Sequence, residues 1–322
     1  MDDPEVATKA PESDAMEDAA QVPEEASAQN NSGLCDQCTS DRPAPPGAAP
    51  TGEITKMDDV DVYVSKPSDY PHLSSKLLLF LTGGTGLHSV NNQLQADKYA
   101  REGFLVIMPD MFGNDPAPNS SSNMEESSQS IIDLIKLRAA ETAKSFLIDM
   151  WLARHTPEKI LPILHRVLEA ARTEFADAVA GGGGIYGVGY CIGAKYILQL
   201  AGAKADDEAS GRKPTDEESG FITSEPLLKC GAAAHGTLIS KEDFEGLRSP
   251  VMLVCIQDDQ LFPEDIRVAG EELLRHSNVD HKFEIYPGVP HGFAVVGEYE
   301  SPKIKAAQEQ AFAQMLEWLK NH

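Results

Sequence analysis

Positive charge is scarce in this chain. Its 322 residues include 27 Lys and Arg against 51 Asp and Glu, which gives a formal net charge of −24. Nucleic acids and anionic membrane surfaces attract proteins through basic patches, so this balance argues against both as partners. The charge carries no information about a small-molecule substrate.

Long apolar runs and abundant cysteine are also missing. No stretch approaches the roughly 20 apolar residues of a transmembrane helix, and no apolar signal segment follows Met1. The five cysteines, an odd number, fit a reducing compartment in which a thiolate survives. We therefore expect a cytoplasmic protein that is a monomer or a weak homodimer.

The remaining composition is that of a globular protein, with 41% hydrophobic and 24% charged residues. Residues 1–33 are an exception, because they are rich in Asp, Glu, Ala and Pro and hold almost no large apolar side chain. Such a segment buries too little surface to offset its ordering entropy. We expect a disordered acidic tail over 1–33, one domain over 34–322, and a polar surface insertion near 203–226.

The most informative stretch is Gly187-Val188-Gly189-Tyr190-Cys191-Ile192-Gly193-Ala194. A β-prone segment precedes it and a helical pattern follows. Gly-x-nucleophile-x-Gly between a strand and a helix is typical of a nucleophile elbow, in which the residue at the tip has a strained backbone. A tight turn around a buried thiol is an alternative. A dinucleotide-binding turn is another, although the glycine spacing misses that fingerprint by one position.

Two later segments favour the elbow. The apolar run 250–256 resembles a buried parallel strand and leads into an acidic loop that contains Asp259. The run 282–286 is a further strand, followed by His291 in a loop rich in Gly and Pro. Nucleophile, acid and histidine in this order, each after a strand, are typical of α/β-hydrolases.

At these residues the chain resembles the dienelactone hydrolase family, and its fungal branch in particular, over about residues 34 to 320. The resemblance implies an α/β-hydrolase fold: a mostly parallel central sheet with helices on both faces and a small helical cap. It also implies hydrolysis of a lactone or ester through a thioester acyl-enzyme, with Cys191 as nucleophile, Asp259 as orienting acid and His291 as base. No cofactor or metal is implied. The matching pieces are Met108–Gly113, Trp151–His155, Gly189–Tyr196, Asp259–Pro263 and His291–Phe293.

The expected strands and helices also suggest which two backbone N–H groups stabilise an oxyanion. In this fold the loop after a central strand supplies one backbone N–H, and the residue after the nucleophile, Ile192, supplies the other. Gly84 or its neighbour is the candidate in the loop 82–86.

We expect the helices at 131–153 and 157–179 to cap the site, with Trp151 and Phe146 in the core. Further elements are an edge strand 60–64, strands 76–81 and 104–108, and helices 91–102, 263–275 and 303–319.

Gly83 is a departure from the family, whose bacterial members carry Glu and many fungal members Asp at this point. The thiolate of Cys191 must then be generated by His291 alone or by an unidentified group. The absence of an acidic residue at Gly83 also favours an alternative, a catalytically weak binding protein with a hydrolase fold.

Tyr190, His235 and Phe293 are candidate pocket residues. His235 ends a short buried strand, and it is either a substrate contact or a hydrogen-bonded structural residue. Relatives bind the carboxylate of dienelactone through Arg side chains, one of them a few residues beyond the catalytic His. Residues 293–297 contain no Arg here. We therefore expect a neutral, more hydrophobic ester or lactone, with dienelactone itself a poor substrate.

Cys35 and Cys38 form a CxxC pair, which could be redox-active or half of a zinc site. The sequence contains no second Cys or His pair at matching spacing, so we expect no metal. With the acidic tail, this pair leaves open a third possibility, a protein whose main role is interaction or redox chemistry.

Overall fold

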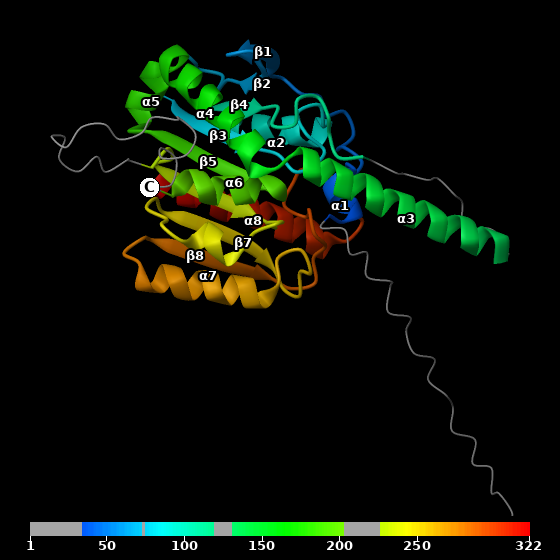
Figure 1. The fold of residues 1–322 in the computed structure, drawn as a ribbon. Coiled ribbons are helices and arrows are strands. Elements are labelled where there is room, and N and C mark those ends of the chain that lie inside the picture. The colour runs from blue at the N-terminus through cyan, green and yellow to red at the C-terminus, as the bar shows by residue number, and fades with distance from the viewer. Residues whose placement is uncertain (1–33, 73–74, 119–130, 203–225) are drawn as a thin grey trace, which may run out of the picture. The chain divides into compact units, whose positions relative to one another are not determined.

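An eight-stranded mixed sheet runs through the chain (Figure 1). The computed structural model describes residues 34–72, 75–118, 131–202 and 226–322, with the backbone alone at 131–141. The strand order is β1-β2-β4-β3-β5-β6-β7-β8. β2 is antiparallel to both of its neighbours, and the remaining pairs are parallel. The strands are β1 (Glu53–Met57), β2 (Val60–Ser65), β3 (Lys76–Leu81), β4 (Phe104–Pro109), β5 (Ile185–Tyr190), β6 (Cys230–Ala234), β7 (Val251–Ile256) and β8 (His281–Tyr286).

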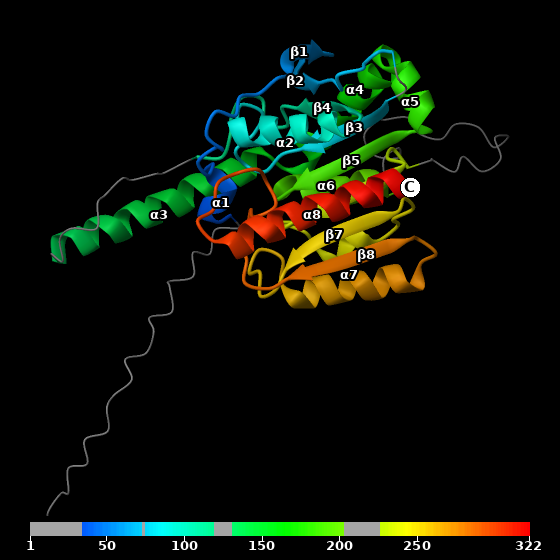
Figure 2. The ribbon, with the colours of Figure 1, turned by 180° about the vertical axis from the view of Figure 1, so that it is seen from behind.

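Helices cover both faces of this sheet (Figure 2). α2 packs on β2 and β4, and α8 packs on β6 and β7, on the face seen in Figure 2. α5 and α6 pack on the opposite face, α5 against β3 and α6 against β3, β5 and β6. The expected α/β-hydrolase architecture is therefore confirmed. The helices are α1 (Asp36–Thr39), α2 (Val90–Arg101), α3 (Ile131–Arg154), α4 (Pro157–Glu174), α5 (Ala176–Gly182), α6 (Ile192–Ala201), α7 (Glu264–His276) and α8 (Pro302–Asn321), with a 3₁₀ turn η1 (Lys241–Phe244).

Burial explains which strands could be recognised. Every residue of β4, β5 and β7 is buried, as parallel strands covered on both faces must be, and these strands are nearly continuous apolar runs. β1 is exposed at four of its five residues and carries no such signal. The expectation that 60–64 forms the edge strand is therefore wrong, because β1 pairs outside β2.

Two expectations about the helices need correction. The expected helix 157–179 ends at Glu174, and α5 begins a new helix after Phe175. α4 contacts β1 and α5, so it covers the sheet rather than the active site. Trp151 of α3 is fully buried, but Phe146 is 63% exposed and is not a core residue. Among the described residues, α1 and α2 are the helices that contribute to the wall of the cavity beside Cys191, through Gln37, Cys38, Asn91 and Asn92.

The predicted acidic tail and the insertion near 203–226 lie outside the described residues, apart from Pro226. The described residues between 34 and 322 belong to one compact unit. Within the described part of the chain, no helix combines the length and apolarity that crossing a membrane requires.

The parallel strands place the chemistry. Because β3, β5, β6, β7 and β8 run in the same direction, the loops that follow them meet at one edge of the sheet. Cys191, His235, Asp259 and His291 all follow one of these strands. The edge therefore collects side chains that are far apart in the sequence.

The close approach of β5 and α6 depends on a missing side chain at Gly189. A Cβ atom there would lie 2.5 Å from the backbone oxygen of Gly193 and 2.6 Å from Ile197. We expect Gly189→Ala to lower the free energy of unfolding by about 2–3 kcal/mol, because the backbone of α6 must move away. Chemical denaturation measures the change. In the matched control Gly202→Ala the new Cβ has no neighbour closer than 3.5 Å, and an equal loss in both variants would contradict this account.

Candidate active site

The backbone at Cys191 has the strained conformation expected at the tip of an elbow. Cys191 lies between the end of β5 and the start of α6, with φ 53° and ψ −117°. Positive φ is uncommon for a residue with a side chain and persists only where the surroundings impose it. Here the Cys191 N–H donates to Ala234 O at 3.2 Å, and the Gly193 N–H donates to Thr82 O at 3.1 Å. Segments following two neighbouring strands thus hold the elbow from both sides.

The structure brings Cys191, Asp259 and His291 to the same edge of the sheet. His291 Nδ1 lies 2.9 Å from Asp259 Oδ2, and both side chains are buried, at 7% and 5% exposed. The other carboxylate oxygen of Asp259 accepts from the backbone N–H of Leu261 at 3.0 Å. This bond holds one oxygen within the loop after β7 and leaves the other oxygen to face the imidazole.

Thr237 connects the thiol to the imidazole, and sequence reasoning did not identify it. Its hydroxyl lies 3.4 Å from Cys191 Sγ and 3.2 Å from His291 Nε2. Its backbone N–H donates to Cys191 O at 3.1 Å. The available signal was its position just after β6, the neighbour of the strand that carries the nucleophile.

Cys191 and His291 shift each other's ionisation. Burial raises the pKa of Cys191, but hydrogen bonds from Cys38 and His291 and the positive charge of His291 lower it, so that the net pKa lies well below 9.0. Burial lowers the pKa of His291, but its contacts with Asp259 and Cys191 raise it to about 10. The electrostatics therefore favour a thiolate–imidazolium pair at neutral pH.

Cys38 lies beside the nucleophile, on the side where the family carries an acidic residue. A Cβ atom at Gly83 would lie 3.1 Å from Cys191 Cβ and 3.6 Å from its Sγ, so this position directly faces the thiol. Burial and the neighbouring Cys191 raise the pKa of Cys38 well above 9.0. Cys38 thus stays protonated and donates to the Cys191 thiolate. A thiol from α1 supplies the hydrogen bond that the sequence could not assign.

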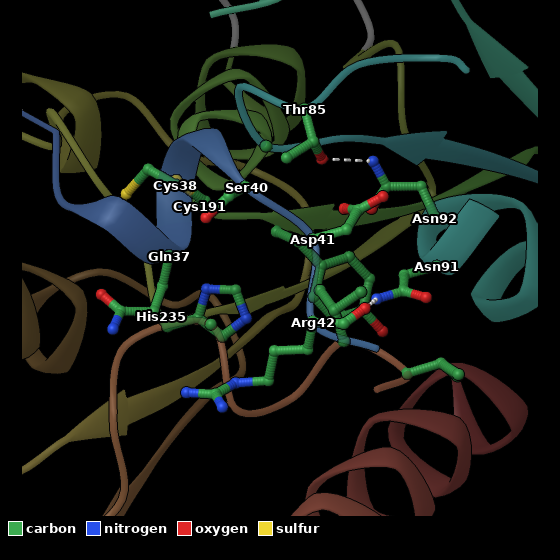
Figure 3. A pocket seen from close by; sticks show the side chains of 15 residues that line it. Gln37, Cys38, Ser40, Asp41, Arg42, Thr85, Asn91, Asn92, Cys191 and His235 are labelled. Carbon is green, nitrogen blue, oxygen red and sulfur yellow. Dashed lines mark hydrogen bonds between the residues drawn. The ribbon is translucent and has the colours of Figure 1, made fainter. Parts of the chain in front are cut away.

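A small cavity lies against Cys191 (Figure 3). Its volume is about 40 Å³, which is room for one or two waters and far below the roughly 300–1,000 Å³ of a small-molecule pocket. Part of its wall comes from α1 and the segment after it, namely Gln37, Cys38, Ser40, Asp41 and Arg42. Figure 3 shows Cys38 beside Cys191, with Asp41 and Arg42 further along the same segment. Cys191 itself is 4% exposed.

The three expected pocket residues have different positions. His235 borders the cavity, is 1% exposed, and has no hydrogen-bond partner on either ring nitrogen among the described residues. The expectation of a hydrogen-bonded structural His is therefore wrong. Tyr190 borders the cavity, but its hydroxyl contacts Gln95 and Tyr99. Phe293 is fully buried behind His235, with the ring centroids 6.2 Å apart, and does not belong to the described cavity wall.

Two further features of the wall bear on expected roles. In the loop after β3, Gly83 faces Cys191, whereas Gly84 packs against the carbonyl oxygen of Cys38. Gly83 is therefore nearer to Cys191 than Gly84, the residue named as the oxyanion candidate.

The wall also includes Arg42, whose guanidinium lies 4.1 Å from the centre of the Tyr299 ring. The N-terminal segment therefore places a cation in the wall, although residues 293–297 contain none.

The fold and the solved structures that resemble it define the class as an α/β-hydrolase. A putative dienelactone hydrolase from Klebsiella pneumoniae superposes with a TM-score of 0.58 and 18% identity, covering 85% of this chain and 100% of that one. Esterase 2 of Thermogutta terrifontis superposes with a TM-score of 0.55 and 14% identity, over 85% of this chain and 94% of the esterase.

Sequence comparison gives the particular family. The dienelactone hydrolase family matches residues 60–211 and 220–322. Hydrolase pyvD of Aspergillus violaceofuscus is 30% identical over 271 residues, which cover 84% of this chain and 90% of that protein. Dienlactone hydrolase 1 of Gibberella moniliformis is 26% identical, over 84% of this chain and 87% of the relative. The chain belongs to the dienelactone hydrolase family, and it is an enzyme of the ester and lactone hydrolase class.

The lowered pKa of Cys191 can be measured as thiolate absorbance in the ultraviolet. We expect Cys191→Ala to remove about one thiolate equivalent at pH 7, because the pKa of this thiol lies well below 9.0. Cys230→Ala is the matched control, since burial raises the pKa of Cys230 to about 12 and its thiol is protonated at pH 7. Absorbance that changes equally in both variants would contradict the ion pair.

Proposed function

We propose that this enzyme hydrolyses a small lactone or carboxylic ester through a Cys191–His291–Asp259 triad and a thioester acyl-enzyme. The observation that carries the proposal is the chain of contacts from the strained thiol through Thr237 to His291, whose other nitrogen is held by Asp259. The comparisons support ester or lactone hydrolysis; the roles of individual residues are our assignment.

The acylation step begins from the thiolate–imidazolium pair. The sulfur of Cys191 attacks the carbonyl carbon and forms a C–S bond, and the carbonyl oxygen becomes an oxyanion. When the carbonyl re-forms, the bond to the leaving oxygen breaks and the alkoxide takes the Nε2 proton of His291. Asp259 keeps the ring in the tautomer that presents Nε2 to the reacting atoms. The products of this step are the alcohol and a thioester.

Deacylation uses the imidazole that acylation has left neutral. His291 takes a proton from water, and the resulting hydroxide attacks the thioester carbon. The C–S bond then breaks, which releases the carboxylic acid and restores the thiolate and the imidazolium. The backbone N–H of Ile192 and an N–H of the loop at Gly83 and Gly84 are our candidates for stabilising both oxyanions, since no acceptor for the Ile192 N–H occurs among the described residues.

The preferred substrate is a neutral ester or lactone with a good leaving group. A thiolate leaves more easily than an alkoxide, so activated esters and enol lactones suit this nucleophile. Val295 and Val296 supply apolar wall, and Asp41 offsets the charge of Arg42. Burial and the neighbouring His291 lower the pKa of His235 well below 6.5. His235 is therefore neutral and has a ring N–H free to bind a substrate oxygen.

The size of the cavity requires the wall to move when substrate enters. A volume of about 40 Å³ does not hold an ester. Residues 37–42 are the part of the wall contributed by the N-terminal segment, so their side chains must shift to admit substrate. Binding of substrate and displacement of α1 are thus coupled in this proposal.

Removal of the nucleophile tests the triad directly. We expect Cys191→Ala to lower kcat/KM for a neutral aryl ester by at least about 10³-fold, since no thioester can form. Cys255→Ala, in the buried strand β7 and outside the described cavity wall, is the control and should retain the wild-type rate. A thiol-directed ester probe should label the wild type and fail to label Cys191→Ala. Binding without turnover in the wild type would favour the catalytically weak binding protein instead.

The pH dependence of kcat/KM tests the ion pair. At low pH activity falls as the Cys191 thiolate is protonated, and at high pH it falls as the imidazolium is lost near pH 10. Since burial alone lowers the pKa of His291 and the bond to Asp259 raises it, Asp259→Asn should move the alkaline limb to lower pH. An alkaline limb that stays in place in this variant would exclude His291 as the acid.

A further inference from the structure

We propose that Cys35, Cys38 and His291 form a Zn²⁺ site that holds the enzyme in an inactive state. Their donor atoms all lie within 4.8 Å of one another, and Cys35 Sγ is 3.2 Å from Cys38 Sγ. The existence of this site is independent of the hydrolytic reaction. Its effect on turnover rests on the proposed function, because it takes up the imidazole assigned there as acid and base.

The donor set suits zinc. Two thiolates and an imidazole are common ligands of Zn²⁺, and two cysteines separated by two residues are a frequent chelating pair. With Zn–S of 2.3 Å, tetrahedral coordination sets the two sulfurs about 3.8 Å apart. The observed separation of the two sulfurs, 3.2 Å, is shorter than that value. The three donor atoms all lie within 4.8 Å of one another, which is longer than that value. Small side-chain adjustments therefore suffice to close the site.

His291 is already oriented as a metal ligand. Its Nδ1 lies 2.9 Å from Asp259, so Nε2, which lies 3.2 Å from the Thr237 hydroxyl, is the nitrogen that would exchange this contact for the ion. A carboxylate that holds one nitrogen while the other binds the ion is the usual arrangement around a zinc-bound histidine. The same contact that orients the ring for catalysis thus orients it for zinc.

The contacts of α1 and its neighbouring residues hold the two cysteines over the site. Asp36 forms an ion pair with Lys144 of α3, and Asp41 accepts from the Ser89 hydroxyl at 2.8 Å. The carbonyl oxygen of Arg42 accepts from the Asn91 side chain at 2.7 Å. The partners in these contacts, Lys144, Ser89 and Asn91, lie outside the segment that carries the two cysteines. The cysteine pair is therefore positioned before an ion arrives, which lowers the entropic cost of binding.

Metal binding would stop the proposed reaction because it occupies Nε2 of His291. Zn²⁺ replaces the thiol protons of Cys35 and Cys38 and the Nε2 proton of His291, and these protons pass to solvent. With Nε2 coordinated, His291 cannot protonate a leaving alkoxide or deprotonate water. Cys191, whose sulfur lies 3.4 Å from the Thr237 hydroxyl that also contacts His291 Nε2, is the neighbouring thiol available to the fourth coordination position.

The test is a titration of the full-length, reduced, metal-free protein with Zn²⁺ in competition with a chromophoric chelator. We expect one Zn²⁺ per chain, and at least about 100-fold weaker binding in Cys35→Ser and in Cys38→Ser. Cys255→Ala is the matched control and should bind as the wild type does. Co²⁺ in place of Zn²⁺ should give a thiolate charge-transfer band that both serine variants lose. Circular dichroism confirms that each variant is folded.

Ester hydrolysis is then compared with and without one equivalent of Zn²⁺ in each variant. We expect zinc to reduce the wild-type rate at least tenfold, a chelator to restore it, and Cys35→Ser to resist inhibition. Zinc affinity that does not change in either serine variant would overturn the inference, even if the enzyme hydrolyses esters. A wild type that binds zinc through the cysteine pair but hydrolyses no ester would overturn the proposed function and leave the metal site intact.

Discussion

The left-handed backbone at Cys191 is the constraint on which the rest of the site depends. It turns the chain from β5 into α6 within one residue and presents the sulfur at the edge of the sheet. The strain is maintained because Ala234 and Thr82, which follow or end neighbouring strands, accept the N–H groups of the elbow. A buried parallel sheet thus holds the sulfur of Cys191 in a rigid position.

Burial strengthens the hydrogen bonds around Cys191 and also limits the volume of the cavity beside it. With little water nearby, hydrogen bonds from Cys38 and His291 can hold a thiolate that burial alone would protonate. The same cover leaves a cavity of about 40 Å³. Gln37 and Cys38 of α1 line this cavity, and Cys38 together with Cys35, the residue before α1, brings two more thiols close to His291.

Much of the fold could be predicted because the central strands are apolar throughout. β3 was located to the residue, and β4, β5, β7 and β8 to within a few residues. β1 was missed because it is an exposed edge strand without a hydrophobic pattern. Phe146 was misplaced because a helical apolar residue is usually buried, and here it faces solvent. Arg42 carried no signal, since it is an ordinary polar residue in a loop, and Thr237 carried only its position shortly after β6.

The sequence by itself determined the strand-to-helix turn at Cys191, the places of Asp259 and His291 after later strands, and the family. These are local patterns, and backbone geometry fixes what each pattern can form. Only the tertiary structure decided what surrounds the thiol, because that depends on segments distant in the chain. The pair Cys35 and Cys38 lacked a partner at any metal-binding spacing in the sequence, and the third ligand, His291, follows the last strand of the sheet. Packing of α1 on the sheet edge brings them together, and no local pattern encodes that contact.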